Sequence, residues 1–104
     1  MYTRLLAYLS LAFYSISNQL INSNHSPQAE FYTSLYKIAD PTNSEAWYFS
    51  AILNARKGNA WAAESDLMKA VATGFRDSNR MVQQPEFLSL HIDFNKIEKS
   101  MHNP

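Results

Sequence analysis

The 104-residue chain contains no cysteine and only two glycines, Gly58 and Gly74. Without cysteine, it has no disulfide framework and no thiolate metal site. Phosphate-binding loops need clustered glycines, which let backbone N–H groups approach the ligand, so this class of site is excluded as well. Any site in the chain must therefore be built from other residue types on regular structure.

Charge is also scarce, because charged residues make up 17% of the chain and nine basic residues balance nine acidic ones. A sequence-independent nucleic-acid binder needs a basic surface field, so we expect no nucleic-acid partner. Apolar residues reach 46%, which predicts a folded core rather than a disordered chain. The length fits one domain covering residues 1–104.

Catalytic and metal-binding patterns are missing. His91 and Asp93 are the only histidine and carboxylate close in sequence, and zinc normally takes three or four protein ligands. No two carboxylates suggest an acid–base pair, and no serine has the spacing of a nucleophile elbow. We expect no metal, no cofactor and no enzyme activity. The following carboxylates are expected on solvated helix faces: Glu30, Glu45, Glu64, Asp66, Glu86 and Glu98.

The N-terminal apolar run from Leu5 to Phe13, which follows Arg4, has the charge and composition of a signal peptide. It also fits an amphipathic first helix, which we favour. Polar residues such as Ser10 interrupt the run too often for it to span a bilayer. The compartment stays open, with the cytoplasm favoured and an origin in an exported protein as the alternative.

Helical periodicity dominates the rest of the chain, and no run shows strict period-two alternation, so the predicted fold is all-α. The expected helices cover about 2–22, 27–39, 43–57, 60–73, 78–83, 85–90 and 94–101.

Capping residues set the expected boundaries. Ser26 is predicted as an N-cap with Pro27 at the first helical position, and Pro41 ends the preceding helix. Thr42 and Glu45 have the spacing of a capping box for the third helix.

A large–small pattern marks the third and fourth helices, with Gly58 at their turn. It consists of Trp47, Ala51, Gly58, Ala63, Leu67 and Ala70. A step of 34 residues relates Phe13 to Trp47 and Ala29 to Ala63, and it puts Pro41 at the end of the earlier unit. This pattern and period resemble the tetratricopeptide repeat (TPR) family. By this pattern Trp47 is expected to be a buried anchor.

The resemblance implies a short TPR-like array of two helix pairs, a fragment of a right-handed solenoid. Residues 2–41 form a degenerate first repeat, residues 42–75 form the second, and residues 76–104 form short capping helices. The tail resembles an end-of-group TPR ending, with Gly74, Phe75, Asp77, Pro85, Phe87, Leu90, Phe94 and Ile97.

Four positions depart from the repeat pattern. In the first unit, Ser17 stands where the second unit has Ala51, and Thr33 stands where it has Leu67. In the second unit, large apolar residues are expected at two positions occupied by polar ones, Ser50 and Asn54.

The first helix is predicted to be an association surface. Its main apolar face consists of Tyr2, Leu5, Leu6, Leu9, Phe13, Ile16 and Leu20. A second stripe, formed by Leu11, Tyr14 and Ile21, lies on another side, and one neighbouring helix pair cannot cover both. We favour a homodimer, because a symmetric contact needs only one self-complementary patch.

In TPR proteins a protein or peptide partner usually lies along the first helix of each repeat. The corresponding groove positions here are Leu11, Tyr14, Asn18, Ile21, Glu45, Tyr48, Ile52 and Arg56. Some TPR proteins clamp a C-terminal carboxylate, but here only Asn18 fits that pattern and Glu45 would repel the ligand.

Two functions follow from the resemblance. The chain is a protein–protein interaction or scaffold module, or it is a structural C-terminal appendage or dimerisation module of a larger repeat protein. An open surface at Leu11, Tyr14, Ile21 and Tyr48 favours the first, and burial of these residues against the chain favours the second.

Overall fold

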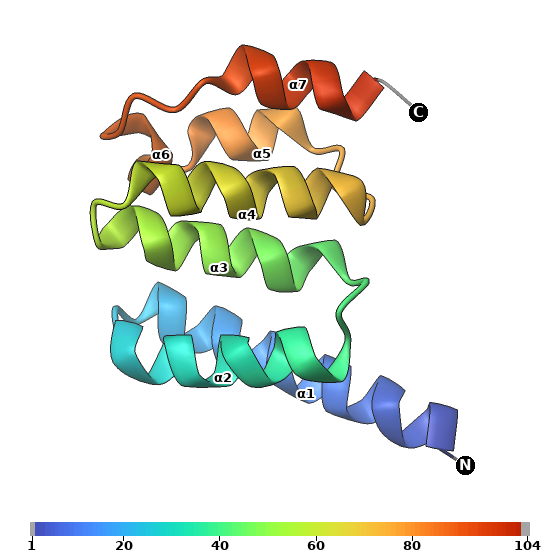
Figure 1. The fold of residues 1–104 in the computed structure, drawn as a ribbon. Helices are drawn as coiled ribbons and strands as arrows, with labels where there is room; N and C mark the ends of the chain where they lie inside the picture. Colours follow the sequence, from blue (N-terminus) through green and yellow to red (C-terminus); the bar gives the residue numbers. More distant parts are fainter. Residues whose placement is uncertain (1, 103–104) are drawn as a thin grey trace.

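In the computed structural model, residues 2–102 are described, together with all side chains in this range except those of Tyr2, Thr3 and Leu6. Residues 2–102 form seven α-helices and no strand, which confirms the all-α prediction (Figure 1). The helices are α1 (Tyr2–Asn22), α2 (Ser26–Ala39), α3 (Ser44–Arg56), α4 (Ala60–Ala72), α5 (Ser78–Gln83), α6 (Pro85–Leu88) and α7 (Phe94–His102).

The helices form two antiparallel pairs, α1–α2 and α3–α4, and α2 packs beside α3 (Figure 1). At the α3–α4 turn, Gly58 has φ +78°, a left-handed conformation that glycine adopts without steric cost. Ala51 and Ala63 are completely buried, and their small side chains let α3 and α4 pack closely.

Two predicted helix starts are wrong by one residue. Ser26 is the first residue of α2, and His25 occupies the N-cap position without a side-chain hydrogen bond to the helix. Asn43 caps α3 instead of Thr42, because its side-chain oxygen accepts a hydrogen bond from the Glu45 backbone N–H at 3.0 Å. Asparagine is among the strongest N-cap residues.

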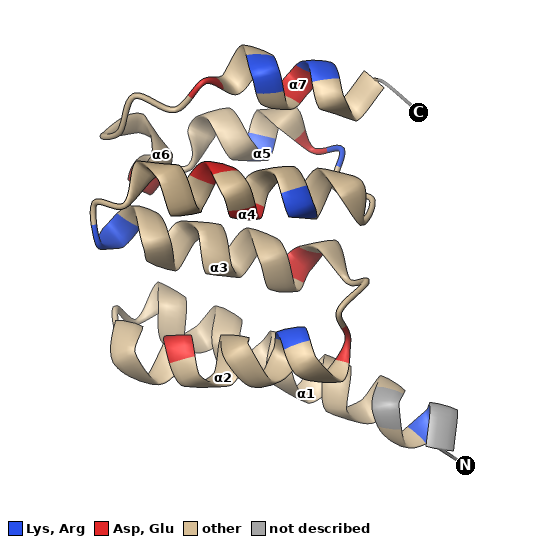
Figure 2. Cartoon of the chain, in the orientation of Figure 1, with Lys and Arg blue, Asp and Glu red and all other residues tan. Residues whose placement is uncertain are grey.

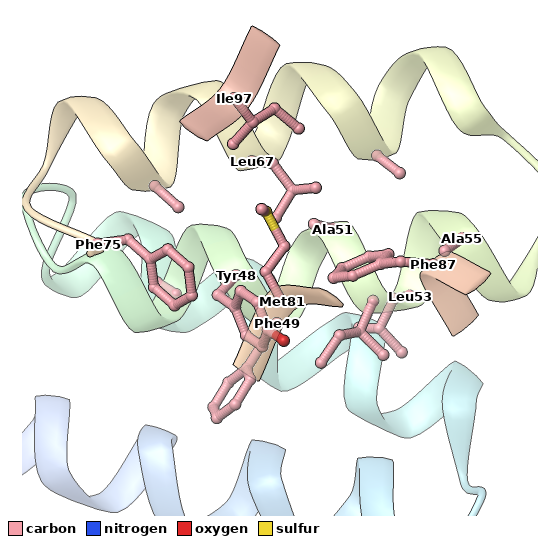
Figure 3. Packing of buried hydrophobic residues seen from close by; sticks show 14 of the residues in the cluster. Tyr48, Phe49, Ala51, Leu53, Ala55, Leu67, Phe75, Met81, Phe87 and Ile97 are labelled. Carbon is pink, nitrogen blue, oxygen red and sulfur yellow. The ribbon is translucent and has the colours of Figure 1, made fainter. Parts of the chain in front are cut away.

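The core is centred on α3, where eight of 13 residues are buried. On one side, the Phe49 ring lies between the rings of Tyr14 and Tyr36, with centroid distances of 5.4 and 6.3 Å. On another side, the Tyr48 ring stacks on Phe75 at 4.7 Å (Figure 3). Helix α3 therefore has packing neighbours on several sides.

Trp47 is only partly buried, so its prediction as a buried anchor is wrong. Its indole N–H donates to the Pro41 carbonyl at 2.9 Å, and the ammonium groups of Lys37 and Lys69 lie over its ring at 5.2 and 4.7 Å. The ring thus lies at the edge of the core, and the adjacent Tyr48 and Phe49 fill the interior.

The C-terminal helices cover the second pair. Helix α6 packs on α3, and α7 packs on α4 through the buried side chains of Ile97 and Met101. The exposed residues of α7 are all polar or charged: Asn95, Lys96, Lys99 and His102. Helix α7 therefore closes this end of the array with a polar surface, as a capping helix must.

Asp66 is buried, contrary to the prediction that it lies on a solvated face. Its carboxylate oxygen Oδ2 accepts hydrogen bonds from Ser50 Oγ and Asn54 Nδ2, both at 2.7 Å. The Lys37 ammonium in turn donates to Ser50 Oγ at 3.2 Å. This network gives Ser50 and Asn54, two polar residues of α3, hydrogen-bond partners on α4.

Candidate interaction surface

Exposed apolar side chains are concentrated in the first helix pair. Among the described residues, eight large apolar side chains are exposed, and six of them belong to α1 and α2. These six are Leu5, Tyr8, Leu9, Leu11, Phe31 and Ile38. The remaining two, Trp61 and Leu88, lie on separate helices of the other half of the molecule.

The N-terminal half of α1 projects past the end of α2 (Figure 1). Ser10 is the α1 residue that contacts Asp40, directly after α2, so the residues before Ser10 have no α2 segment beside them. Four exposed side chains form what we call the α1 ridge: Leu5, Tyr8, Leu9 and Leu11, with exposed fractions of 55%, 66%, 37% and 67%. From Leu5 to Asn22 the helix carries no charged residue (Figure 2).

Beside the α1 ridge lies a cleft of about 520 Å³, where α1 meets the end of α2 and the start of α3. We call it the first-pair cleft, and its lining consists of Ala7, Ser10, Leu11, Tyr14, Tyr36, Ala39, Asp40, Asn43 and Glu45. Leu11 belongs to both features, whereas Leu5, Tyr8 and Leu9 are rotated by about 100–160° around α1 from the cleft residue Ser10.

The polar part of the cleft is built around Asp40. Its carboxylate oxygen Oδ2 accepts hydrogen bonds from Ser10 Oγ at 2.7 Å and from Asn43 Nδ2 at 3.0 Å. Both donors are neutral, and no ion pair involves Asp40 within the described part of the chain. The cleft therefore presents a carboxylate whose charge has no cationic partner there.

Two other polar groups complete the cleft. Burial raises the pKa of Tyr36 to about 12, although a hydrogen bond with Ser10 opposes this and the charge of Asp40 adds to it, so the phenol stays neutral. Glu45 Oε1 forms an ion pair with Arg80 at 2.6 Å. Its second oxygen, Oε2, is buried and has no hydrogen-bond partner within residues 2–102.

The four groove positions predicted on α1 differ in exposure. Leu11 is exposed and Tyr14 is half-buried, and both line the first-pair cleft. Asn18 is half-buried and accepts a hydrogen bond from Asn22 at 3.4 Å. Ile21 is buried in the core. The open part of the predicted groove on α1 is therefore its N-terminal portion.

Three of the four positions predicted on α3 contact the chain's own C-terminal segment: Glu45, Tyr48 and Arg56. Tyr48 and Ile52 are fully buried, and Tyr48 packs between Phe75 and Phe87. Arg56 donates to Glu86 at 2.8 Å. Together with the Glu45–Arg80 ion pair, these interactions hold α5 and α6 on α3. Only Glu45, of these four, lines the open cleft.

Sequence reasoning missed Ser10, Tyr36 and Asp40 as cleft residues. Asp40 directly precedes Pro41, the residue that ends the second helix in the sequence pattern. A signal existed, because in an antiparallel helix pair turning near residues 23–25 the partner of residue 40 lies between residues 6 and 10. That register places the Ser10 hydroxyl beside the Asp40 carboxylate.

Comparisons with protein-family models, characterised proteins and solved structures gave no match. Across residues 2–102, no three histidine, aspartate or glutamate side chains lie close enough together to hold a metal ion. Within the same range, none of the helices has the length and apolar character needed to cross a membrane.

Proposed function

We propose that this chain is a non-catalytic protein–protein interaction module of the TPR type, which binds its partner through the α1 ridge and the first-pair cleft. The observation that carries this proposal is the difference between the two ends of the array. Helix α7 closes one end with polar side chains, whereas α1 leaves an uncharged apolar surface open at the other. A monomer rarely leaves a contiguous apolar patch of several hundred Å² exposed.

The shape of the surface favours a helical segment of protein as the ligand. A projecting helix with exposed residues at positions 5, 8, 9 and 12 offers the i, i+3, i+4, i+7 spacing that another helix recognises. The adjoining carboxylate of Asp40 favours a partner that brings a basic side chain to the cleft. The partner is therefore expected to combine an apolar helix face with at least one arginine or lysine.

A second candidate function is a structural role, in which the chain closes a longer helical-repeat array. The polar outer face of α7 favours this role, since terminal repeats of solenoids need a polar cap. In that case the α1 ridge would pack against a helix of the preceding repeat. Both functions use the same surface and differ in where the covering helix comes from.

An apolar fluorescent dye tests whether the α1 ridge is an open binding surface. We expect the dilute protein to enhance the dye's fluorescence, and the double change Tyr8→Asp with Leu11→Asp to lower this at least threefold. Leu88→Asp is the matched control, because Leu88 is 62% exposed but lies on α6. Equal dye binding by all three proteins would contradict the proposal.

A further inference from the structure

We propose that the first-pair cleft binds an arginine side chain of the partner protein, and that the guanidinium group of this arginine pairs with the Asp40 carboxylate. This inference rests on the proposed function, since it names the chemical group that one part of the proposed surface recognises. It does not depend on what covers the α1 ridge, because Leu5, Tyr8 and Leu9 lie on another side of α1 from the cleft residue Ser10.

The cleft carries one negative charge in excess. The described residues that line it include the carboxylates of Asp40 and Glu45, and none of them is lysine, arginine or histidine. Glu45 forms its ion pair with Arg80, whose guanidinium carbon lies over the Tyr48 ring at 4.3 Å. Within residues 2–102, Asp40 has only neutral hydrogen-bond donors. One cation on a partner would therefore complement the charge of Asp40.

One oxygen of the Asp40 carboxylate is held by the chain itself, and the other is open. Oδ2 accepts the hydrogen bonds from Ser10 and Asn43, which fix the position of the carboxylate. Oδ1 accepts no hydrogen bond within the described part of the chain, and it is not one of the buried oxygens that lack a partner there. It is therefore accessible to a ligand. A hydrogen bond from a guanidinium to such an oxygen is charge-assisted and roughly twice as strong as a neutral one.

The rest of the lining fits the stem and the flat head of an arginine. Ala7, Leu11 and Ala39 give the cleft apolar walls, along which an arginine stem packs while its charged head reaches a polar group. The half-buried ring of Tyr14 also lines the cleft, and a guanidinium stacks on aromatic faces. A guanidinium is more weakly hydrated than the ammonium of lysine, so it enters a partly apolar cleft at a lower cost. Arginine is therefore favoured over lysine.

Backbone amide NMR on the isotope-labelled full chain tests the inference with three capped tripeptides that differ in one side chain. The first is leucine-arginine-leucine, the second has lysine at the centre, and the third has citrulline, which keeps the shape of arginine without its charge. We expect a Kd on the order of 1 mM for the arginine peptide, with the largest shifts at Ser10, Leu11 and Asn43. The citrulline peptide should bind at least about tenfold more weakly, and the lysine peptide about threefold more weakly.

Two variants with the same change in net charge separate the cleft from the rest of the surface. Asp40→Asn removes the charge but keeps an acceptor oxygen for Ser10 and Asn43, and it should bind the arginine peptide about tenfold more weakly. Glu98→Gln is the matched control on α7, at the opposite end of the array (Figure 1), and it should bind like the parent. If Asp40→Asn does not fold, the arginine and citrulline peptides on the parent decide the question.

The outcomes distinguish this inference from the proposed function. Equal binding of the arginine and citrulline peptides overturns recognition by the Asp40 charge, and equal binding of the lysine peptide overturns the choice of arginine. Free arginine amide that binds as tightly as the arginine peptide overturns a protein as the source of the cation. A parent that binds the apolar dye but no arginine peptide overturns this inference and leaves the interaction module standing. Binding of the arginine peptide without dye binding supports the cleft site and overturns the α1 ridge as a binding surface.

Discussion

The second helix pair is packed on both sides, and the first pair is packed on one. Eight of the 13 residues of α3 are buried, whereas in α2 only Ala29, Thr33 and Tyr36 are buried. Helices α5, α6 and α7 supply the additional neighbours of the second pair. Burial in this molecule therefore depends on position in the array as well as on residue type, because the first helix is at least as apolar as the third.

The two helix pairs also differ in the hydrogen-bond partners of their buried polar groups. In the second pair, Ser50 and Asn54 donate to the buried carboxylate of Asp66. In the first pair, the buried hydroxyls of Ser17 and Thr33 have no hydrogen-bond partner among residues 2–102. A buried polar group without a partner costs about 1–3 kcal/mol. In the second pair, Glu45 Oε2 on α3 is likewise buried without a partner in this range, so the first pair has two such atoms and the second pair has one.

Truncating the core of the second pair should have the largest effect. Phe49→Ala removes a buried ring that contacts both Tyr14 and Tyr36, so we expect a loss of about 3–5 kcal/mol in the free energy of unfolding. Leu11→Ala, in the first pair, should cost less than about 1 kcal/mol because Leu11 is exposed. Urea denaturation of both variants measures the comparison, and equal losses would contradict it.

Removing the carboxylate of Asp66 should come next. Asp66→Ala leaves the Ser50 and Asn54 donors unpaired, and we expect a loss of about 2–4 kcal/mol. Asp66→Asn keeps one acceptor oxygen and the side-chain volume, so its loss should be smaller by at least about 1 kcal/mol. Thermal unfolding of the two variants tests this ranking. If both lose the same small amount, the network does not stabilise the second pair.

The two tryptophans should behave differently. Trp47→Ala is expected to cost about 1–2 kcal/mol, less than a fully buried aromatic, because the ring lies at the edge of the core. Trp61→Ala should change stability by less than about 0.5 kcal/mol, since this side chain is 79% exposed. A urea titration followed by far-UV circular dichroism suits both variants. A loss above about 3 kcal/mol in the free energy of unfolding for Trp47→Ala would show that Trp47 is a core anchor.

Removing an unpaired hydroxyl should strengthen the first pair. Ser17→Ala removes a buried polar group and installs alanine, the residue found 34 positions later at Ala51. We expect a gain of about 1 kcal/mol, seen as a higher midpoint in urea denaturation. The matched control is Ser15→Ala on the exposed side of α1, which should be neutral. A destabilised Ser17→Ala would mean that the hydroxyl is satisfied in solution.

The ion pair between Arg56 on α3 and Glu86 on α6 should give the smallest effect, and one that depends on pH. Burial raises the pKa of Glu86, but hydrogen bonds from Gln84 and Arg56 outweigh it, so the pKa is lowered overall. A carboxyl group whose pKa is lowered in the folded state stabilises the protein at pH values above its unfolded pKa of about 4.3. This stabilisation is lost as the pH falls through the folded-state pKa. Glu86→Gln should therefore cost about 0.5–1 kcal/mol at pH 7. Urea titrations of Glu86→Gln and the parent at pH 7 and pH 3 should show that their difference in the free energy of unfolding disappears in acid.

Sequence periodicity was sufficient for the helices, because each helix has an apolar face and a recognisable boundary. Gly58 marked the α3–α4 turn, where its left-handed conformation suits glycine. Periodicity could not assign burial to individual residues. Trp47 and Tyr48 are adjacent, yet only Tyr48 is buried, where Phe75 and Phe87 of the tail pack against its ring.

The candidate surface was only partly visible in the sequence. The excess of apolar residues on α1 could be counted, so Leu11 and Tyr14 were named. The cleft also needs Asp40, which reaches it through the register of the α1–α2 pair, a property of tertiary structure. The burial of Asp66 could not be predicted for the same reason, because its partners Ser50 and Asn54 come from another helix.

The hydrogen bonds of Arg56 affect how the protein unfolds. Its guanidinium donates to the Ile21 carbonyl, to the Ser26 hydroxyl and to Glu86, and these partners lie 30 to 35 residues away in the chain. In an open solenoid each repeat touches only its neighbours and can unravel from one end. Here one side chain joins the α1–α2 turn to α6, across α3. Fraying of the tail therefore loosens the first turn as well, which favours a single cooperative melting transition over stepwise loss of repeats.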